Sequence, residues 1–437
     1  MALGACQSVV LEQAPPVSQP DIEIDLPAMR HPAPQNPVPV TRSNHDMVQD
    51  FLDLSFEMES GHEIQSLSRF EGAITLRVLG AIPPTLEHDL SILLNRLRSE
   101  ANVNIRRVAE DEPASITIST ITTDELHGVM PGAACFVAPR VSTWEEFRQN
   151  RRRPTLDWTT LDTRETVSIF LPHDQSPQEI RDCLHEELAQ ALGPLNDLYR
   201  LTDSVFNDDN FHTVLTGFDM LMLRVYYAPE MHSGMSRAEA EVVVPAILRR
   251  YNPAGENGTR YETERSSRDW VNTVLRAIGA GTSDATRRRS AERAIAIAER
   301  SEWADNRLAF SHYLYGLMMQ PISAEASYAS LLIAHDIYSA RRHTRIHAAY
   351  VSAQLAMFEI RNEMAPQALS RLDEAIATAQ RHENAALTST LYFLKAKAQE
   401  VLGRPNQATL QQALAWGQYG FRDRAMLLRH MAEIQSL

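Results

Sequence analysis

The chain has 437 residues, 44% of them hydrophobic, so it can bury a sizeable core and is expected to be globular with two or three domains. Its 56 acidic and 42 basic side chains give a formal net charge of −14. This charge repels a phosphate backbone, so we expect no nucleic-acid partner. No stretch approaches the roughly 20 apolar residues that span a bilayer, and the sequence predicts no transmembrane helix.

The N-terminus, MALGACQSV, contains a short motif that ends at Cys6. Leu3 and the three residues after it resemble a bacterial lipobox, in which the signal peptide is cut before a cysteine that then receives a lipid. This resemblance implies a lipid anchor at Cys6 and a bacterial cell-envelope protein facing the periplasm. The charged and apolar regions that precede a lipobox are missing, so a chance run of small residues is the alternative.

Proline marks the next segment. Residues 14–42 hold eight prolines, a composition that favours an extended, semi-rigid tether over a packed core. We therefore predict that residues 1–45 form the lipobox remnant and a proline-rich tether. A tail with no anchor is the alternative.

The chain has three cysteines. If lipidation uses Cys6, then Cys135 and Cys183 remain as an even pair for one disulfide in an oxidising periplasm. In the cytosol these two residues would instead be buried thiols.

Between residues 46 and 250 the sequence alternates strand and helix patterns. The expected strands and one leucine-striped helix are, in chain order, strand 69–80, helix 86–101, and strands 114–120, 134–139 and 166–172. A second helix begins after Ser176, with Pro177 in the first position and Glu179 in the third, which predicts a capping box. Gly193 is expected to end this helix.

Alanine-rich helical segments fill residues 255–437. At an offset of 40 residues, three alanines of one segment match three of the next, namely Ala356, Ala368 and Ala375 with Ala396, Ala408 and Ala415. Segment 308–320 would start an earlier unit. Small residues at fixed places in helical hairpins resemble tetratricopeptide-type arrays, which implies a protein or peptide partner. A plain helical bundle is the alternative.

The helix ending at Gly193 contains CLHEELAQALGPLND, residues 183–197. Metzincin zinc peptidases carry HExxHxxGxxH, in which three histidines bind zinc and the glutamate is the general base. Read from His185, the second histidine position holds alanine. Read one residue later, every spacing fits, but the positions of histidine, glutamate, histidine, glycine and histidine hold Glu186, Glu187, Gln190, Gly193 and Asn196.

The resemblance to metzincins extends beyond this helix, over about residues 65–240. In SVFNDD, residues 204–209, Phe206 occupies the position of the methionine turn. Segment 215–229, with Asp219, is similar to the closing helix of such domains. The resemblance implies an α+β zincin-like, metzincin-type domain over residues 46–250, followed by an all-α, tetratricopeptide-like helical-repeat domain over residues 255–437.

The sequence also resembles an uncharacterised family of proteobacterial lipoproteins that carry a domain of unknown function. The segments that carry this resemblance are HEELAQALG, NDLYRLTDSVFNDD and YYAPEMHSGMS. The family has no settled activity, so this resemblance implies a fold and a compartment but no chemistry.

Oxygen donors stand at all three ligand positions, Glu186, Gln190 and Asn196, and neutral amides are poor zinc ligands. We therefore expect no bound metal and no cofactor. Zinc and calcium stay open as alternatives, the latter at the acidic cluster Asp203, Asp208 and Asp209. The two amides could also simply satisfy buried backbone groups.

These observations favour an envelope-anchored binding or scaffold lipoprotein. Its metzincin-like domain would be catalytically degenerate, its old groove would recognise a peptide, and its helical repeats would bind a protein. The main alternative is an active periplasmic metallopeptidase or other hydrolase in which Glu187 activates a metal-bound water. A cytosolic regulator with an accidental N-terminal motif is the third hypothesis.

Overall fold

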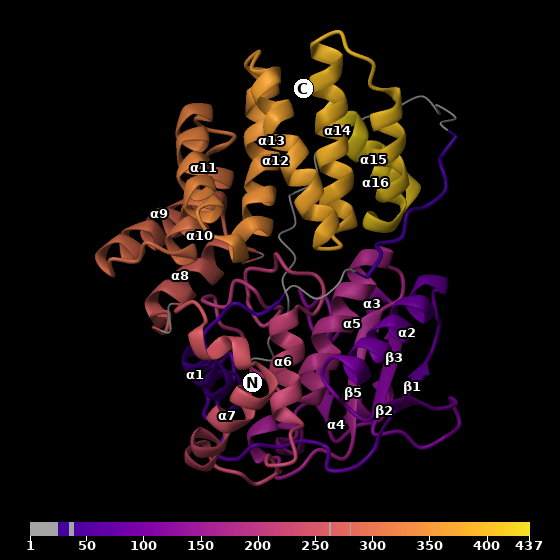
Figure 1. The fold of residues 1–437 in the computed structure, drawn as a ribbon. Coiled ribbons are helices and arrows are strands. Elements are labelled where there is room, and N and C mark those ends of the chain that lie inside the picture. Colours follow the sequence, from indigo (N-terminus) through magenta and orange to yellow (C-terminus); the bar gives the residue numbers. More distant parts are fainter. Residues whose placement is uncertain (1–24, 35–38, 262–263, 280) are drawn as a thin grey trace. The chain divides into compact units, whose positions relative to one another are not determined.

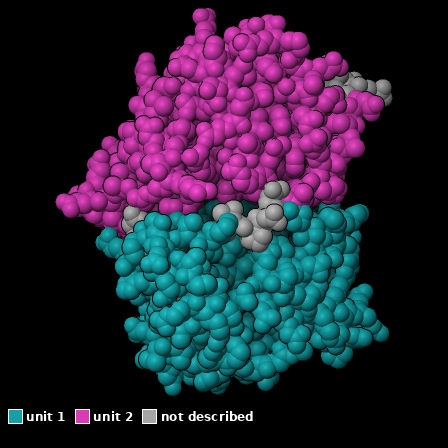
Figure 2. All heavy atoms as spheres, viewed as in Figure 1, with its two compact units in different colours: residues 1–6, 34–266 teal, residues 7–33, 267–437 magenta. Residues whose placement is uncertain are grey.

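The computed structural model describes residues 25–34, 39–261, 264–279 and 281–437. The predicted lipidation site, Cys6, lies outside this part of the chain. The described residues form two compact units, one of residues 34–266 and one of residues 25–33 and 267–437 (Figures 1 and 2). The first unit is α+β and the second is all helical, as the sequence predicted. Within the described residues, no helix has both the length and the apolar character that a membrane crossing requires.

The first unit is built on a five-stranded sheet with the strand order β2-β1-β3-β5-β4. The bounds are β1 Ile74–Leu79, β2 Ile105–Arg107, β3 Ile116–Ile121, β4 Phe136–Pro139 and β5 Val167–Pro172. β4 pairs antiparallel with β5, and the other neighbouring strands pair in parallel. Three of these strands, β1, β4 and β5, lie within predicted segments, and β3 extends one residue beyond its predicted segment, to Ile121. The short edge strand β2 was not predicted, because three residues carry little alternation.

Helices cover both faces of the sheet (Figure 1). Ile169 of β5 belongs to the large core shared with α2 (Pro84–Ser99) and α5 (Pro177–Leu192). The next residue along the strand, Phe170, packs instead against Phe136 and the residues of α3 (Thr123–His127) and α4 (Trp144–Asn150). This double covering explains why β5 is a continuous buried run and not an alternating one.

Helix α1 (Asn44–Ser55) was not predicted, and its composition shows why. Asp50 and Asp53 lie on its buried side, where an amphipathic pattern would require apolar residues. Arg42 and Arg200 neutralise them: Arg200 donates to Asp50 at 2.8 Å and to Asp53 at 3.1 Å, and Arg42 donates to Asp50 at 3.1 Å. The remaining helices of this unit are α6 (Gly217–Tyr226), α7 (Arg237–Tyr251) and the 3-10 turns Pro154–Leu156, Trp158–Thr160 and Pro253–Asn257.

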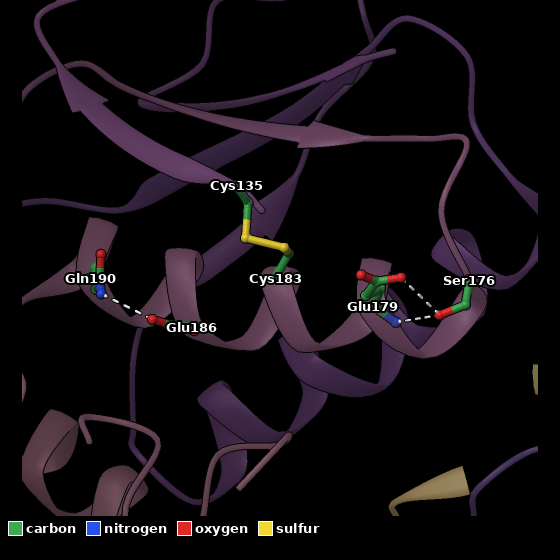
Figure 3. The surroundings of a disulfide bond; sticks show 6 residues. All are labelled: Cys135, Ser176, Glu179, Cys183, Glu186 and Gln190. Carbon is green, nitrogen blue, oxygen red and sulfur yellow. Dashed lines mark hydrogen bonds between the residues drawn. A yellow bond between two sulfur atoms is a disulfide. The ribbon is translucent and has the colours of Figure 1, made fainter. Parts of the chain in front are cut away.

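Helix α5 has the predicted bounds, and of the predicted capping box it has the hydrogen bond accepted by Ser176. The Ser176 hydroxyl accepts the main-chain N–H of Glu179 at 3.1 Å, and the helix stops at Leu192, directly before Gly193. The predicted disulfide between Cys135 and Cys183 is present and joins α5 to the segment that leads into β4 (Figure 3).

The second unit is a series of helices in which each packs on the next. Their bounds are α8 Arg268–Ile278, α9 Asp284–Arg300, α10 Asn306–Met319, α11 Ala324–Ser339, the 3-10 turn Arg342–Thr344, α12 Arg345–Arg361, α13 Ala365–Arg381, α14 Ala385–Val401, α15 Gln407–Gly420 and α16 Arg424–Gln435. α12 and α14 have the same length, and α14 starts and ends 40 residues after α12. The predicted repeat-like character of this region is therefore confirmed.

The matched alanines behave alike except for one. Ala356 and Ala396 are buried, as are Ala375 and Ala415, whereas Ala408 is exposed although its partner Ala368 is buried. α15 begins two residues later than a strict 40-residue repeat of α13 requires, which removes Ala408 from the packed face.

Part of the predicted tether packs on helices. Residues 25–33 belong to the helical unit, where the N–H of Arg30 donates to the carbonyl of Ala415 at 3.0 Å and the ring of His31 packs edge-on against Tyr419. Arg42, near the other end of the segment, is fully buried in the first unit. Prolines keep such a segment out of helices and sheets, but its other residues still have groups that can bind a folded surface.

Candidate functional site

The three altered ligand positions do not share one set of contacts. Glu186 and Gln190 lie one turn apart on α5, both half-buried, and the Gln190 amide reaches a Glu186 oxygen only at 3.5 Å (Figure 3). Asn196 lies beyond the helix, and its amide donates to the carbonyl oxygen of Asp53 at 2.9 Å. The position of the third metzincin ligand therefore binds the backbone of α1.

Glu187, the residue at the general-base position, is only 2% exposed. Its Oε2 atom is buried and has no hydrogen-bond partner among the described residues. Burial raises the pKa of this carboxyl well above its ordinary value, and the charge of Glu186 raises it further. The environment therefore favours the protonated acid.

His185, which stands one position out of register, has a structural contact. Its Nδ1 atom accepts the N–H of Leu215 at 3.1 Å, which fastens the segment before α6 to α5. Burial lowers the pKa of the imidazole well below its ordinary value, and the charges of Arg96 and Arg181 act in the same direction. A neutral ring that accepts a backbone hydrogen bond is consistent with both effects.

The C-terminal end of α5 is closely packed and fully bonded. A Cβ atom on Gly193 would lie 3.1 Å from the ring of Tyr226, so the ring would have to shift by a few tenths of an ångström to accept a larger residue. Arg164 donates to the carbonyl of Ala191 at 2.8 Å, and the Tyr227 hydroxyl donates to that of Leu192, also at 2.8 Å. These donors satisfy carbonyl groups that a helix end leaves open.

Phe206, at the position of the methionine turn, is fully buried, and its segment is held by Asp219. Asp219 accepts the hydroxyl of Ser204 at 2.5 Å and the N–H of Val205 at 3.2 Å. It also accepts the N–H of Thr216 at 2.7 Å, which completes a capping box at the start of α6. Burial raises the pKa of Asp219 to about 6 despite these donors.

Near these residues, three carboxylates converge from separate segments. One oxygen atom from each of Glu59, Asp197 and Asp208 lies within 4.8 Å of the other two. The acidic cluster predicted from the sequence is divided: Asp208 joins this group, whereas Asp203 pairs with Arg42. The carboxylate of Asp209 accepts hydrogen bonds from its own loop.

Local backbone contacts hold each of the three carboxylates in place. Glu59 lies in a tight turn in which the N–H of Met58 donates to the carbonyl of His62 at 2.9 Å. The residues on either side of Asp197 are both anchored, since the Asn196 amide donates to the carbonyl of Asp53 at 2.9 Å and the N–H of Leu198 donates to the carbonyl of Phe206 at 3.0 Å. The loop of Asp208 is braced by the preceding side chain, because the Asn207 amide donates to the carbonyl of Leu201 at 3.2 Å.

The cluster is electrostatically unfavourable without a counter-charge. Burial raises the pKa of both Asp197 and Asp208 well above the ordinary value, and each is raised further by neighbouring carboxylates, including Glu59 and Glu186. The charge of Glu187 also raises the pKa of Asp197. Glu59, Glu186, Glu187 and Asp209 therefore lie near enough to affect the ionisation of Asp197 or Asp208.

Comparison with known proteins identifies the segment that contains this arrangement. Residues 44–246 match the family described as Protein of unknown function (DUF2927). The match covers somewhat less than half of the chain; it begins at the first residue of α1 and includes the sheet, α5 and the carboxylate cluster. It leaves the helical unit outside. No curated protein matches the chain.

Within the DUF2927 segment, sequence reasoning missed Glu59 and Asp197. Asp197 directly follows Asn196, the residue assigned to the third ligand position. The motif stops at Asn196 and therefore did not include Asp197. Glu59 follows α1, which was itself not predicted. Only the folded chain brings Glu59 to the end of α5.

The helical unit contains a groove of about 320 Å³ between α11, α12 and α13. Small side chains line it, including Ala348, Ala349 and Ser352. Charged residues lie beside them: Arg371 pairs with Glu359 at 2.9 Å, and Arg345 pairs with Glu374. The groove is therefore lined by small side chains and by charges of both signs.

Proposed function

We propose that this chain is a non-catalytic binding or scaffold lipoprotein of the bacterial cell envelope. In this proposal a lipid on Cys6 anchors the chain and the DUF2927 segment forms a metzincin-like domain that has lost its zinc ligands. The groove of the helical unit binds a protein or peptide.

The observation that carries the proposal is the contact between Asn196 and Asp53. A metzincin site needs three imidazoles directed at one ion. Here the third position donates to a backbone carbonyl, and the first two hold a carboxylate and an amide. This arrangement supports the loss of zinc-dependent peptide hydrolysis.

The disulfide supports the compartment. Bonds such as Cys135–Cys183 persist in oxidising surroundings and are rare in reducing cytosol. Growth with labelled palmitate tests the anchor: we expect the label to enter the wild-type chain and not Cys6→Ser. Equal labelling of both, or recovery of unlabelled protein from the cytoplasm, would exclude it.

Catalysis is tested with the full chain, a diverse peptide library and added zinc or calcium. We expect no cleavage above that of the buffer, and no difference between the wild type and Glu187→Gln. Metal-dependent cleavage that Glu187→Gln abolishes would instead establish the alternative, a metallohydrolase with Glu187 as its base.

The groove is tested with a photo-reactive residue at Ser370, an exposed position in its lining. We expect a discrete adduct in living cells that is lost when Arg345→Glu reverses one charge. Arg345 lies in an exposed ion pair, and such pairs contribute little to stability, so the fold should tolerate the change. The matched control places the photo-reactive residue at Gln411, an exposed position outside the groove. An adduct unaffected by Arg345→Glu would argue against the groove.

A further inference from the structure

Two pairs of acidic side chains in the first unit have different surroundings: Asp50 and Asp53 are buried, whereas Asp197 and Asp208 are half-buried. Asp50 and Asp53 of α1 are neutralised by arginines, with Arg200 contacting both. In contrast, neither Asp197 nor Asp208 has an ion pair with a basic side chain in the described part of the chain. The neighbouring charges that shift the pKa values of Asp197 and Asp208 are all carboxylates.

The spacing of the cluster fits a cation held by oxygen atoms. Calcium binds oxygen at roughly 2.3–2.6 Å, so two ligands on opposite sides of the ion lie roughly 4.6–5.2 Å apart. The oxygens of Glu59, Asp197 and Asp208 lie within 4.8 Å of one another, inside that limit. Three carboxylates can supply up to six oxygens when each binds through both, and water can complete the shell.

Two buried oxygens point to a missing partner. The Oδ1 atom of Asp197, a member of the cluster, is inaccessible to solvent and has no hydrogen-bond partner among the described residues. The same holds for Oε2 of Glu187, whose side chain is 2% exposed and whose charge acts on Asp197. An unpaired buried oxygen is unfavourable, so each of these two atoms requires an explanation.

We propose that Glu59, Asp197 and Asp208 bind a calcium ion, with Glu187 as a flanking carboxylate. The ion would join the turn after α1, the segment after α5 and the loop before α6. The role would be structural, because the three segments that the ion joins lie apart in the sequence and carry the three carboxylates that converge. The proposal does not depend on the binding function proposed above, and no catalytic step is involved.

The experiment is a calcium titration of the full chain, purified with a chelator and followed by calorimetry and by thermal unfolding. We expect binding in or below the roughly 10⁻⁴–10⁻³ M range of extracellular calcium modules, together with a higher Tm. Asp208→Asn should weaken binding at least tenfold. Asp111→Asn makes the same chemical change at an exposed position of the same unit and should have no effect.

Other outcomes are equally decisive. No heat and no shift in Tm for the wild type at millimolar calcium would overturn the proposal, whatever the variants do. If Asp208→Asn fails to fold, Glu59→Gln in the half-exposed turn replaces it, and terbium luminescence displaced by calcium gives a second measurement. Tight zinc binding in preference to calcium would also overturn it and would favour the hydrolase. The two proposals can fail separately. Peptide cleavage would contradict the proposed function, and the absence of calcium binding would contradict the cation site.

Discussion

The side-chain amide of Asn196 donates to the main-chain carbonyl oxygen of Asp53 at 2.9 Å, which ties the end of α5 to the last turn of α1. The neighbouring N–H of Leu195 donates to Leu54 in the same turn, so two successive residues make this link. Asp197 follows directly and is thereby held against Asp208. One short segment thus makes this link and supplies a carboxylate to the acidic cluster.

Replacing Asn196 with alanine removes this link. The carbonyl of Asp53 loses a donor in a buried place, and such a loss costs about 1–3 kcal/mol. We expect the free energy of unfolding, measured in urea, to fall by that amount. Asn104→Ala, an exposed asparagine of the same unit, is the control and should change it by less than about 0.5 kcal/mol. Equal stability of Asn196→Ala and the wild type would show that the link is dispensable.

The disulfide should contribute substantially to stability. Cys135 and Cys183 are separated by 48 residues, and closing a loop of that length stabilises a fold by about 4 kcal/mol in the chain-entropy description. We therefore expect a reducing agent to lower the free energy of unfolding of the wild type by about 4 kcal/mol, seen as a lower urea midpoint. The double variant Cys135→Ala, Cys183→Ala should start at the lower midpoint and not respond to the reducing agent. A response in that variant would trace the effect to another group.

The helical unit offers a test of close packing at Gly420, the last residue of α15. Alanine is the better helix former by about 1 kcal/mol. However, a Cβ atom at this position would lie 2.5 Å from the Cα of Ala386 and 2.6 Å from its nitrogen, and a backbone cannot move aside cheaply. The cost of this overlap should exceed the gain in helix propensity, so we expect Gly420→Ala to lower the free energy of unfolding by about 1–3 kcal/mol.

Gly403→Ala is not a suitable control, because Gly403 has a φ of +65°. Ser436→Ala, near the C-terminus, is preferable, since it changes one exposed side chain without adding a contact at a packed helix pair. A rise in Tm for Gly420→Ala would mean that α14 and α15 separate easily, and the repeat packing would be looser than the structure indicates.

The parts of the fold that local chemistry specifies could be predicted from sequence. Ser176 and Gly193 mark the two ends of α5 because capping depends on neighbouring residues. The pairing of Cys135 with Cys183 followed from the number of cysteines and the expected compartment. Helix α1 could not be predicted, since its buried aspartates are acceptable only beside Arg200, which is distant in sequence.

The candidate site was predictable only in part for the same reason. The helix motif indicated Glu187, and the acidic stretch after it, with Asp203, Asp208 and Asp209, was an alternative calcium site to the expectation of no metal. Long-range contacts decide which acids of that stretch come together. Arg42 forms an ion pair with Asp203, whereas Glu59 and Asp197 lie close to Asp208. No spacing rule connects residues that lie on three segments.

The pH dependence of Asp208→Asn tests the electrostatics of the cluster in calcium-free protein. Burial and neighbouring carboxylates raise the pKa of Asp208 above its ordinary value of 3.8, so the folded chain holds this proton more tightly than the unfolded chain. The stability it contributes is therefore present below pH 3.8 and is lost as the pH rises through the raised pKa. We expect Asp208→Asn to match the wild type in acid. At mildly alkaline pH with a chelator it should be more stable by about 1 kcal/mol, the size of repulsion between partly exposed charges.

Calcium should reverse that order, because the wild type gains a bound ion that the variant holds poorly. Urea unfolding at several pH values, with chelator or with calcium, measures both effects on the same two proteins. A variant that is less stable than the wild type in chelator at alkaline pH would mean that the Asp208 carboxylate has a favourable partner. The acids of Glu59, Asp197 and Asp208 would then be balanced within the chain, and no cation would be needed to hold the three segments together.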